Sequence, residues 1–244
     1  HAFKGVDVVA ALDVVDWTRG SHKLNTQTRE VSVVTAPDCK WIDVGFADIE
    51  ISKWATDYNK HHNWDLRVLG DSALSLPALT AACQKRIDGN KSLTTKIAER
   101  KKAIGDRHAR QWQKWQEQVK EEWNQRPMTE SRLAHELWQV IQGEDWVLTA
   151  NTLKEWVHKV WDFNQPYRHV GRELGTGTQI GLSIGVALAH KGTGKLVIDL
   201  QPDGDLMFDL GALWMPVKYQ IPMLIVMYNN RAYYNDWAHQ IHMA

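Results

Sequence analysis

Two short loops of oxygen-bearing side chains lie in the last fifth of the chain. Pro202-Asp203-Gly204-Asp205 follows one apolar run, and Asn229-Asn230-Arg231-Ala232 follows the next. Mg²⁺ prefers oxygen ligands and usually combines a carboxylate with phosphate oxygens and water. Asp203 would supply the carboxylate and Asn230 an amide oxygen, while Gly204 would let a phosphate approach the backbone. A following helix would add free N–H groups and its positive end. The loops therefore predict a site for Mg²⁺ and a diphosphate.

The two loops can meet only if they end neighbouring parallel strands. We expect strands at Lys195 to Leu200 and Met223 to Tyr228, joined by a helix from Leu206 to Tyr219, which together form a βαβ unit. Ligands of open α/β folds bind at the carboxyl ends of such strands. The domain that contains this βαβ unit is expected to begin near Met128. Its earlier elements are expected at Arg132 to Ile141 (helix), Trp146 to Ala150 (strand), Lys154 to Trp161 (helix) and Gly171 to Ala189 (glycine-rich loop and helix).

The first third of the chain predicts a second, mostly parallel sheet. Val6 to Val15 and Val31 to Thr35 are valine-rich runs that we interpret as buried strands. Further strands at Lys40 to Ile49 and Leu66 to Leu69, followed by a helix from Pro77 to Ile87, continue the alternation that is typical of α/β folds. The predicted fold class is therefore α/β.

A long exposed helix is predicted between Lys91 and Arg126, where Lys, Arg, Glu and Gln dominate. Its apolar residues recur at spacings of three and four, which places them on one helix face; they are Trp112, Trp115, Val119 and Trp123. We expect this stripe to dock onto a domain. The alternative, a stacking platform for single-stranded nucleic acid, is disfavoured because such platforms rarely follow strict helical spacing.

Composition excludes several classes of partner. The chain has 244 residues, with 29 Lys plus Arg against 29 Asp plus Glu. No global field therefore favours nucleic acid or an anionic membrane. The two cysteines, Cys39 and Cys83, suit a reducing compartment, and no apolar run is long enough to span a membrane. We expect a soluble, cytoplasmic protein. Four tryptophans, Trp138, Trp146, Trp156 and Trp161, are expected in the core or at a subunit interface.

The Asp-Gly pair followed by Asn-Asn resembles the signature of thiamine diphosphate-dependent enzymes, in which the two motifs are 27 positions apart, as Asp203 and Asn230 are here. The resemblance implies that Asp203 and Asn230 bind Mg²⁺ through their side chains and Ala232 through its carbonyl. It also implies that the diphosphate rests on Gly204 and Asp205. A glycine-rich loop that would face the cofactor rings lies upstream, and its members are Gly175, Thr176, Gly177 and Thr178.

Two positions depart from the family pattern. Pro202 replaces the usual first glycine of the signature, and Asp205 replaces a residue that is commonly small. A carboxylate at this position would repel a diphosphate. We therefore expect the Asp205 side chain to turn away and cap a helix that starts at Leu206.

The resemblance also implies a domain organisation. Residues 1–88 look like the later part of a parallel-sheet, Rossmann-like central domain, 89–127 like a helical connector, and 128–244 like the thiamine diphosphate-binding α/β domain. Both domains are expected to be incomplete. In the family a glutamate of a separate N-terminal domain activates the cofactor, usually across a subunit interface. That residue has no counterpart in this sequence, so the chain alone is expected to be inactive. We also expect the enzyme to be a homodimer or homotetramer with its active site at a subunit interface.

The implied activity is that of the branch containing acetolactate synthase and benzoylformate decarboxylase. These lyases and transferases cleave or form a carbon–carbon bond on a 2-oxo acid or related small carbonyl compound. Catalytic residues are unassigned, although Asp236 or His239 could carry protons, with a solvent-facing helix as the equal alternative. FAD occurs in some relatives, but Asp13 to Asn25 show no pattern for it. A catalytically silent relative, or a nucleotide-binding module with Gly175 to Gly181 as its loop, remain alternatives.

Overall fold

A computed structural model describes residues 3–14, 18–25, 28, 30–46, 63–150, 153, 155–170 and 176–243. The chain forms two compact units, His1–Arg100 and Lys101–Ala244. Both are built around parallel strands and helices, which confirms the predicted α/β class. Some predicted positions, at Val15, residues 47–49 and Lys154, lie outside the described residues. Within the described ranges, no helix is both long enough and apolar enough to cross a membrane.

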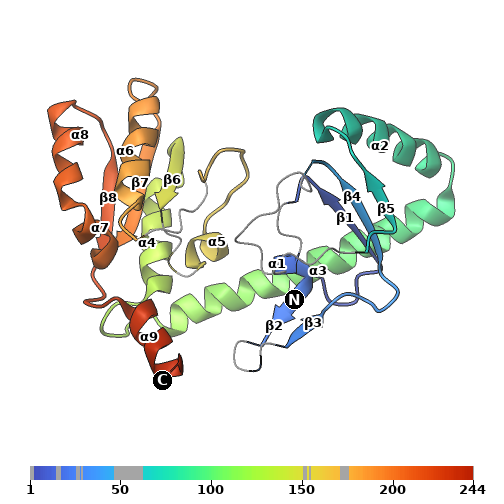
Figure 1. Cartoon of the computed structure of the whole chain (residues 1–244), viewed down its shortest axis with the longest axis horizontal. Helices are drawn as coiled ribbons and strands as arrows, with labels where there is room; N and C mark the ends of the chain where they lie inside the picture. The colour runs from blue at the N-terminus through green and yellow to red at the C-terminus, as the bar shows by residue number, and fades with distance from the viewer. Residues whose placement is uncertain are drawn as a thin grey trace. The chain divides into compact units, whose positions relative to one another are not determined.

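The first unit contains a three-stranded parallel sheet in the order β1-β4-β5 (Figure 1). Its strands are β1 (Val8–Leu12), β4 (Lys40–Val44) and β5 (Leu66–Val68), and Val9 pairs with Trp41 while Ile42 pairs with Leu66. A short helix, α1 (Thr18–Ser21), leads into β2 (His22–Leu24), which pairs antiparallel with β3 (Val31–Val33). The predicted parallel sheet is confirmed for three of the four predicted strands.

The prediction of a buried strand at Val31 to Thr35 is wrong. β3 belongs to the separate two-stranded ribbon, and Val31 and Val33 are 50% and 56% exposed. Both valines point to the same face, because side chains alternate along a strand. A two-stranded ribbon cannot bury a face by itself. Valine content thus indicated a strand correctly but did not indicate burial. Val8 in β1 is likewise half exposed.

Helix α2 (Ser72–Ile87) begins five residues earlier than predicted. The Asp71 carboxylate accepts a hydrogen bond of 2.7 Å from the Ala73 backbone N–H, so Asp71 caps the helix. Pro77 therefore lies inside α2 rather than at its start. The misplacement came from treating proline as the first helical residue.

Helix α3 (Lys91–Glu121) confirms the predicted long helix, although it ends at Glu121 and not at Arg126, so that Trp123 follows the helix end. Of its apolar stripe, Val119 is 2% exposed and belongs to the core of the second unit. Trp115 and Trp123 are partly buried against the same core, whereas Trp112 is about half exposed. The expected docking of the stripe is therefore confirmed for its last three residues.

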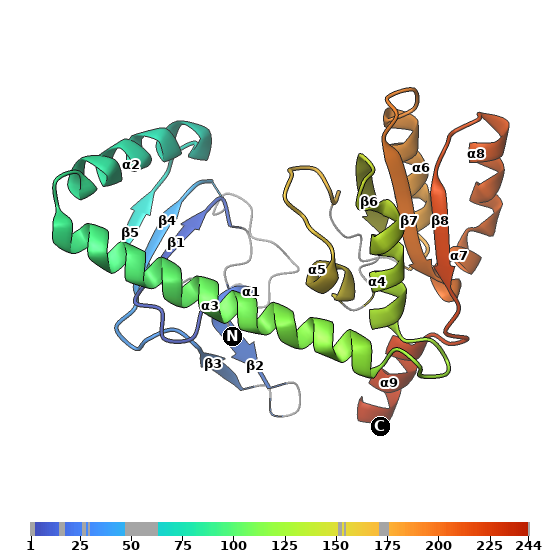
Figure 2. The same cartoon turned by 180° about the vertical axis from the view of Figure 1, so that it is seen from behind.

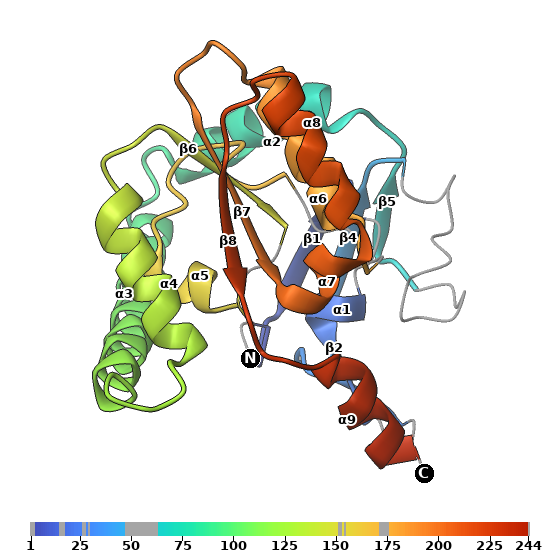
Figure 3. The ribbon, with the colours of Figure 1, turned by 90° about the vertical axis from the view of Figure 1, so that its left-hand side faces the viewer.

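The second unit is a parallel sheet in the order β6-β7-β8, which can be followed from both sides (Figure 1 and Figure 2). The strands are β6 (Trp146–Ala150), β7 (Leu196–Pro202) and β8 (Leu224–Tyr228). Helices α4 (Glu130–Ile141) and α5 (Trp156–Val160) cover one face, and α6 (Gln179–Ala189) covers the other (Figure 3). Thr129 caps α4 by accepting a hydrogen bond from Arg132 N–H, so the helix begins two residues before the predicted Arg132. The βαβ prediction is confirmed.

Strand β7 is buried on both faces of this sheet. Ile198 and Leu200 pack with α4 and α5, while Val197 packs with α6. This double burial explains why the strand reads as a nearly continuous apolar run. On the α4 side, Trp138, Trp146 and Trp161 form ring contacts with centroids 5.2 to 6.0 Å apart. The tryptophans expected in the core are therefore found there.

The single helix predicted from Leu206 to Tyr219 is three helical segments. These are α7 (Asp203–Phe208), a 3₁₀ turn (Leu210–Leu213) and α8 (Trp214–Lys218). Asp209 has φ −135° and ψ 50°, outside the helical region, so the backbone breaks there. The break is short, and the apolar spacing on either side does not reveal it. A final helix, α9 (Tyr234–Met243), extends beyond the end of β8 (Figure 3).

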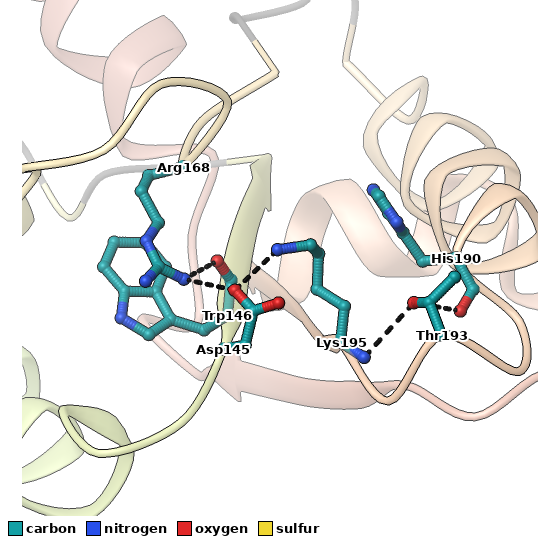
Figure 4. A network of polar contacts seen from close by, with 6 residues as sticks. All are labelled: Asp145, Trp146, Arg168, His190, Thr193 and Lys195. Atoms are coloured by element: carbon teal, nitrogen blue, oxygen red, sulfur yellow. Dashed lines mark hydrogen bonds and ion pairs between the residues drawn. The ribbon is translucent and has the colours of Figure 1, made fainter.

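The amino-terminal edge of this sheet carries a charge network (Figure 4). Asp145, just before β6, accepts hydrogen bonds from Arg168 Nη1 at 3.0 Å and from Lys195 Nζ at 2.6 Å. Arg168 also donates to the Trp146 carbonyl at 2.6 Å, and its guanidinium lies 4.7 Å from the centre of the Trp146 ring. The hydrogen bond from Lys195 is the main cause that lowers the pKa of Asp145. The network joins β6, β7 and the segment around Arg168.

Candidate functional site

The two predicted loops lie next to each other at the carboxyl-terminal edge of the sheet. β7 and β8 are paired in parallel with Pro202 opposite Tyr228, so both strands end at the same level. The Asn230 backbone N–H donates a hydrogen bond of 3.2 Å to Asp203 Oδ1. The expectation that the Asp203 and Asn230 loops would meet is therefore confirmed, across 27 positions of sequence.

The second loop is held in shape by its own asparagines. Asn229 Oδ1 accepts a hydrogen bond from Arg231 N–H, and Asn230 Oδ1 accepts one from Ala232 N–H, each at 3.0 Å. Asparagine favours turns because its side chain can accept such bonds from the backbone two residues ahead. Arg231 has φ 58°, in the left-handed region. The Asn-Asn pair therefore specifies a tight turn that directs Asn230 and Ala232 back toward the Asp203 loop.

The first loop is shorter than expected, because α7 begins at Asp203 itself. Asp203 and Asp205 both lie in the first helical turn, where carboxylates interact favourably with the helix dipole. The expectation that Asp205 caps a helix starting at Leu206 is wrong. The residue before the helix is Pro202, and no side chain caps it. Proline fixes the backbone there and lets the strand pass directly into the helix.

Two glycines of the site are covered by aromatic rings. A Cβ added to Gly204 would lie 2.8 Å from Tyr233 Cε1, so the Tyr233 ring packs directly on the Gly204 backbone. A Cβ added to Gly177 would lie 2.6 Å from Phe208 Cβ, and Gly177 has φ +83°. Phe208 and Tyr233 contact each other edge to face, with ring centroids 6.1 Å apart. The glycine-rich loop, α7 and the second loop thus converge on this aromatic pair.

The structure describes some of the remaining residues predicted for the glycine-rich loop. Thr176 and Gly177 form a turn, and Thr178 is the residue before α6, with no capping hydrogen bond from its side chain. Gly175 lies outside the described residues. The Gly177 contact with Phe208 brings this loop to α7, which begins with Asp203. The predicted ring-facing loop and the predicted diphosphate loop are therefore neighbours.

A buried acid on β7 is not among the residues predicted for the thiamine diphosphate site. Asp199 is fully buried, on the face of the sheet that packs against α6, and its Oδ2 accepts a hydrogen bond of 2.6 Å from Gln201 Nε2. Burial raises the pKa of Asp199 to about 7, and the negative charge of Asp205 adds to the rise. Hydrogen bonds from Ser183 and Gln201 act in the opposite direction. The sequence feature that could have indicated this residue is a carboxylate inside a run of apolar strand residues.

The donor atoms at this edge fit Mg²⁺. A carboxylate, an amide oxygen and a backbone carbonyl are the hard oxygen ligands that this ion prefers. Asp203 is partly exposed and Asn230 and Ala232 are exposed, so these residues are accessible from solvent at the sheet edge. Among the described residues, no three His, Cys, Asp or Glu side chains gather in a way that could hold a metal ion. A metal here would therefore depend on Asp203 with neutral oxygens and a ligand's phosphates.

Asp236 and His239, the candidate proton carriers, lie on α9, and both side chains are exposed. Asp236 occupies the first turn of the helix. Their role stays a prediction, as do the assignments of ligands to Asp203, Asn230 and Ala232.

Comparison with known proteins assigns the part of the chain that carries the site. Residues 150–240 match the family model for the thiamine pyrophosphate enzyme C-terminal TPP binding domain. The matched range runs from the end of β6 into α9 and contains both loops. No curated protein matches the chain. The match supports a thiamine diphosphate-dependent enzyme family for this segment, and thiamine diphosphate as its cofactor.

Proposed function

We propose that this chain carries the Mg²⁺- and thiamine diphosphate-binding part of an enzyme that cleaves or forms a carbon–carbon bond on a 2-oxo acid or related carbonyl compound. The proposed activity is that of a decarboxylase or an acetolactate synthase-like carboligase. The observation that carries it is the hydrogen bond between the Asp203 and Asn230 loops, inside a segment that matches a TPP binding domain.

In this proposal Mg²⁺ is bound by the Asp203 carboxylate, the Asn230 amide oxygen and the Ala232 carbonyl. The diphosphate rests on Gly204 and Asp205, and the rings face the loop that contains Gly175, Thr176, Gly177 and Thr178. When bound, thiamine diphosphate supplies a nucleophilic carbon and an electron sink. The chain's own task is geometric. The hydrogen bond that Asp203 Oδ1 accepts from Asn230 N–H holds the two loops beside each other, which supports a metal site formed by both.

The Asp205 carboxylate is the least favourable feature of this proposal, because a diphosphate is also anionic. Divalent Mg²⁺ offsets this repulsion, as bound cations are often the largest local charges in such sites. The first turn of α7 adds partial positive charge from its free N–H groups. Asp236 and His239 are proposed as proton carriers on the exposed side of α9.

We also propose a homo-oligomer in which a partner subunit completes the active site. Large apolar side chains are exposed along α8 and α9, as expected for surfaces that another chain covers. They are Trp214, Met215, Val217, Tyr234, Trp237 and Ile241.

Titration calorimetry on the full-length protein tests the metal and cofactor assignment. Thiamine diphosphate should bind in the presence of Mg²⁺ and not after its chelation, and Asp203→Ala should abolish binding. Asp209→Ala is the matched control, because it removes an exposed carboxylate six positions further along the same segment. Binding by Asp203→Ala at wild-type strength would contradict the metal assignment.

The reaction class needs a separate measurement. The full-length enzyme loaded with thiamine diphosphate and Mg²⁺ should release CO₂ from at least one member of a panel of 2-oxo acids. Product analysis in the presence of a second carbonyl compound would separate decarboxylation from ligation. Tight cofactor binding without turnover of any 2-oxo acid would instead favour the catalytically silent relative.

A further inference from the structure

The aromatic contact at Gly204 joins the two loops that carry the proposed metal ligands. Tyr233 directly follows Ala232 of the second loop, and Gly204 directly follows Asp203 of the first. An added Cβ at Gly204 would lie 2.8, 3.1 and 3.4 Å from three Tyr233 ring atoms. The Tyr233 hydroxyl also donates a long hydrogen bond of 3.4 Å to the Gly204 carbonyl. The ring, rather than this weak bond, makes the close contact.

The contact continues to the glycine-rich loop through Phe208. The Phe208 and Tyr233 rings meet edge to face, an arrangement favoured by the charge distribution of aromatic rings. Phe208 in turn lies against Gly177. A single aromatic pair thus touches all three backbone segments that the proposed function assigns to the cofactor. Both rings are also substantially exposed, at 63% for Phe208 and 49% for Tyr233, so they are not ordinary core residues.

We propose that Tyr233 is a positioning residue whose ring, packed on Gly204 and against Phe208, sets the distance between the Asp203 loop and the Asn230 loop. This inference rests on the proposed function, because it assigns the ring's effect to Mg²⁺-dependent cofactor binding. Residues that orient metal ligands without touching the metal commonly change affinity strongly when they are removed. Without the ring, the loops would keep the Asn230–Asp203 hydrogen bond but lose the packing that fixes their spacing.

The proposal adds a second physical requirement for glycine at position 204. The first reason is the approach of a phosphate to the backbone, and the second is the approach of the Tyr233 ring. Gly204 does not have the positive φ that disfavours other residues, so a methyl group would conflict with the ring and not with the backbone conformation. Gly177 differs, since its φ of +83° disfavours any side chain whatever surrounds it. The two glycines therefore respond differently when their aromatic neighbour is removed.

Calorimetric titration of thiamine diphosphate at fixed Mg²⁺ tests the positioning role in the full-length protein. Tyr233→Ala should weaken binding roughly 10- to 100-fold. Tyr233→Phe should bind like wild type, because it keeps the ring. Tyr219→Ala is the matched control, as Tyr219 is similarly exposed and its ring makes a similar edge contact with Trp214. The weakening should also be larger at low Mg²⁺ than at saturating Mg²⁺, which a general loss of stability would not produce.

A thermal unfolding cycle without cofactor tests the contact itself. Gly204→Ala should lower the melting temperature clearly in the wild-type background and much less in the Tyr233→Ala background. Gly177→Ala should remain destabilising in the presence of Phe208→Ala, because its φ is unchanged and alanine keeps the Phe208 Cβ that lies 2.6 Å from the added methyl group. Equal effects of Gly204→Ala in both backgrounds would show that the ring does not exclude the methyl group, and would overturn the inference.

The failures of the two proposals are distinguishable. If wild type binds thiamine diphosphate and Tyr233→Ala binds it equally well, only the positioning role is overturned. If wild type itself binds none, the proposed function fails and the positioning role fails with it. Weak binding by Tyr233→Phe as well as by Tyr233→Ala would place the effect in the hydroxyl group and overturn the role assigned to the ring.

Discussion

At the amino-terminal edge of the β6-β7-β8 sheet, Asp145 accepts hydrogen bonds from two cationic side chains, Arg168 and Lys195. At the carboxyl-terminal edge, Asp203 accepts a hydrogen bond from a backbone N–H of Asn230 instead. Both acids sit at strand ends of the same sheet, and both are tied to a neighbouring segment. The first acid is paired with two cationic side chains of the chain itself, while the second is the residue that we propose to bind Mg²⁺.

This difference predicts that the amino-terminal edge contributes to the stability of the fold and the carboxyl-terminal edge to ligand binding. Charges that are matched within the chain hold segments together but offer nothing to a ligand. A carboxylate bonded only to backbone dipoles retains strong affinity for a divalent cation, because no competing positive side chain has to be displaced. Substitutions at the amino-terminal edge should therefore change the free energy of unfolding, and substitutions at the carboxyl-terminal edge should change ligand affinity.

The effect expected at the carboxyl-terminal edge is on binding. Asp203→Asn keeps the shape of the side chain but removes its charge, so Mg²⁺-dependent affinity for thiamine diphosphate should fall by roughly 100-fold. The melting temperature without cofactor should change little, because an amide oxygen can still accept the bond from Asn230 N–H. Calorimetry and thermal unfolding on the same samples check both statements. A large loss of stability with intact affinity would reverse the contrast between the edges.

Asp199, between the two edges on β7, is expected to control pH dependence. Its pKa in the folded chain is about 7, against 3.8 for a solvent-exposed aspartate, so between these values the folded state holds a proton that the unfolded state releases. The free energy of unfolding should therefore fall as pH rises from about 4 to about 7 and level off above, by at most roughly 4 kcal/mol. Asp199→Asn should remove this fall and be more stable than wild type at about pH 8.

Urea unfolding across this pH range measures the Asp199 effect. Asp209→Asn, which changes an exposed carboxylate, should keep the wild-type profile. Identical pH dependence in wild type and Asp199→Asn would refute the assignment of the titration to this buried acid.

Arg168→Met tests the amino-terminal edge. The side chain of Arg168 is 10% exposed, and its loss removes the bond to the Trp146 carbonyl and the contact with the Trp146 ring. We expect a loss of roughly 2 kcal/mol in the free energy of unfolding, with cofactor affinity nearly unchanged. Arg110→Met, an exposed position on α3, is the control. Urea unfolding and calorimetry should agree that only stability is affected.

Lys195→Met should have the smallest effect. Asp145 is largely exposed and would keep its bond to Arg168, so solvent and salt screen most of the interaction. The pKa of Asp145 is lowered in the folded chain, so the stabilisation exists above the unfolded pKa and disappears as pH falls. The small difference in melting temperature between wild type and variant should vanish at high salt and in acid.

Sequence patterns were most successful where burial and spacing act together. The β7 and β8 strands, α4 and the meeting of the Asp203 and Asn230 loops followed from apolar patterns and from the geometry of parallel strands, and α3 followed from its content of Lys, Arg, Glu and Gln. At β3, strand propensity predicted the strand but not its exposure, because valine favours extended backbone whether or not another layer covers the strand. The start of α7 at Asp203 was missed because the helix begins directly after a strand residue, and no capping polar residue before it indicates a helix start.

Tertiary contacts within the site were beyond sequence reasoning. The Tyr233 ring reaches Gly204 across 29 positions, and no local pattern records that contact. The raised pKa of Asp199 likewise depends on layers that cover the strand from α6. Patterns along a chain identify which atoms can act as ligands, whereas close packing between distant segments decides how they are held.

The tryptophan cluster beside Arg168 gives the second unit an optical signal of its own. Trp138, Trp146 and Trp161 have ring centroids 5.2 to 6.0 Å apart, at defined angles. Indoles at such separations couple electronically and produce strong circular dichroism in the near ultraviolet. Because Arg168 lies 4.7 Å from the centre of the Trp146 ring, this part of the spectrum should be sensitive to the packing of the amino-terminal sheet edge.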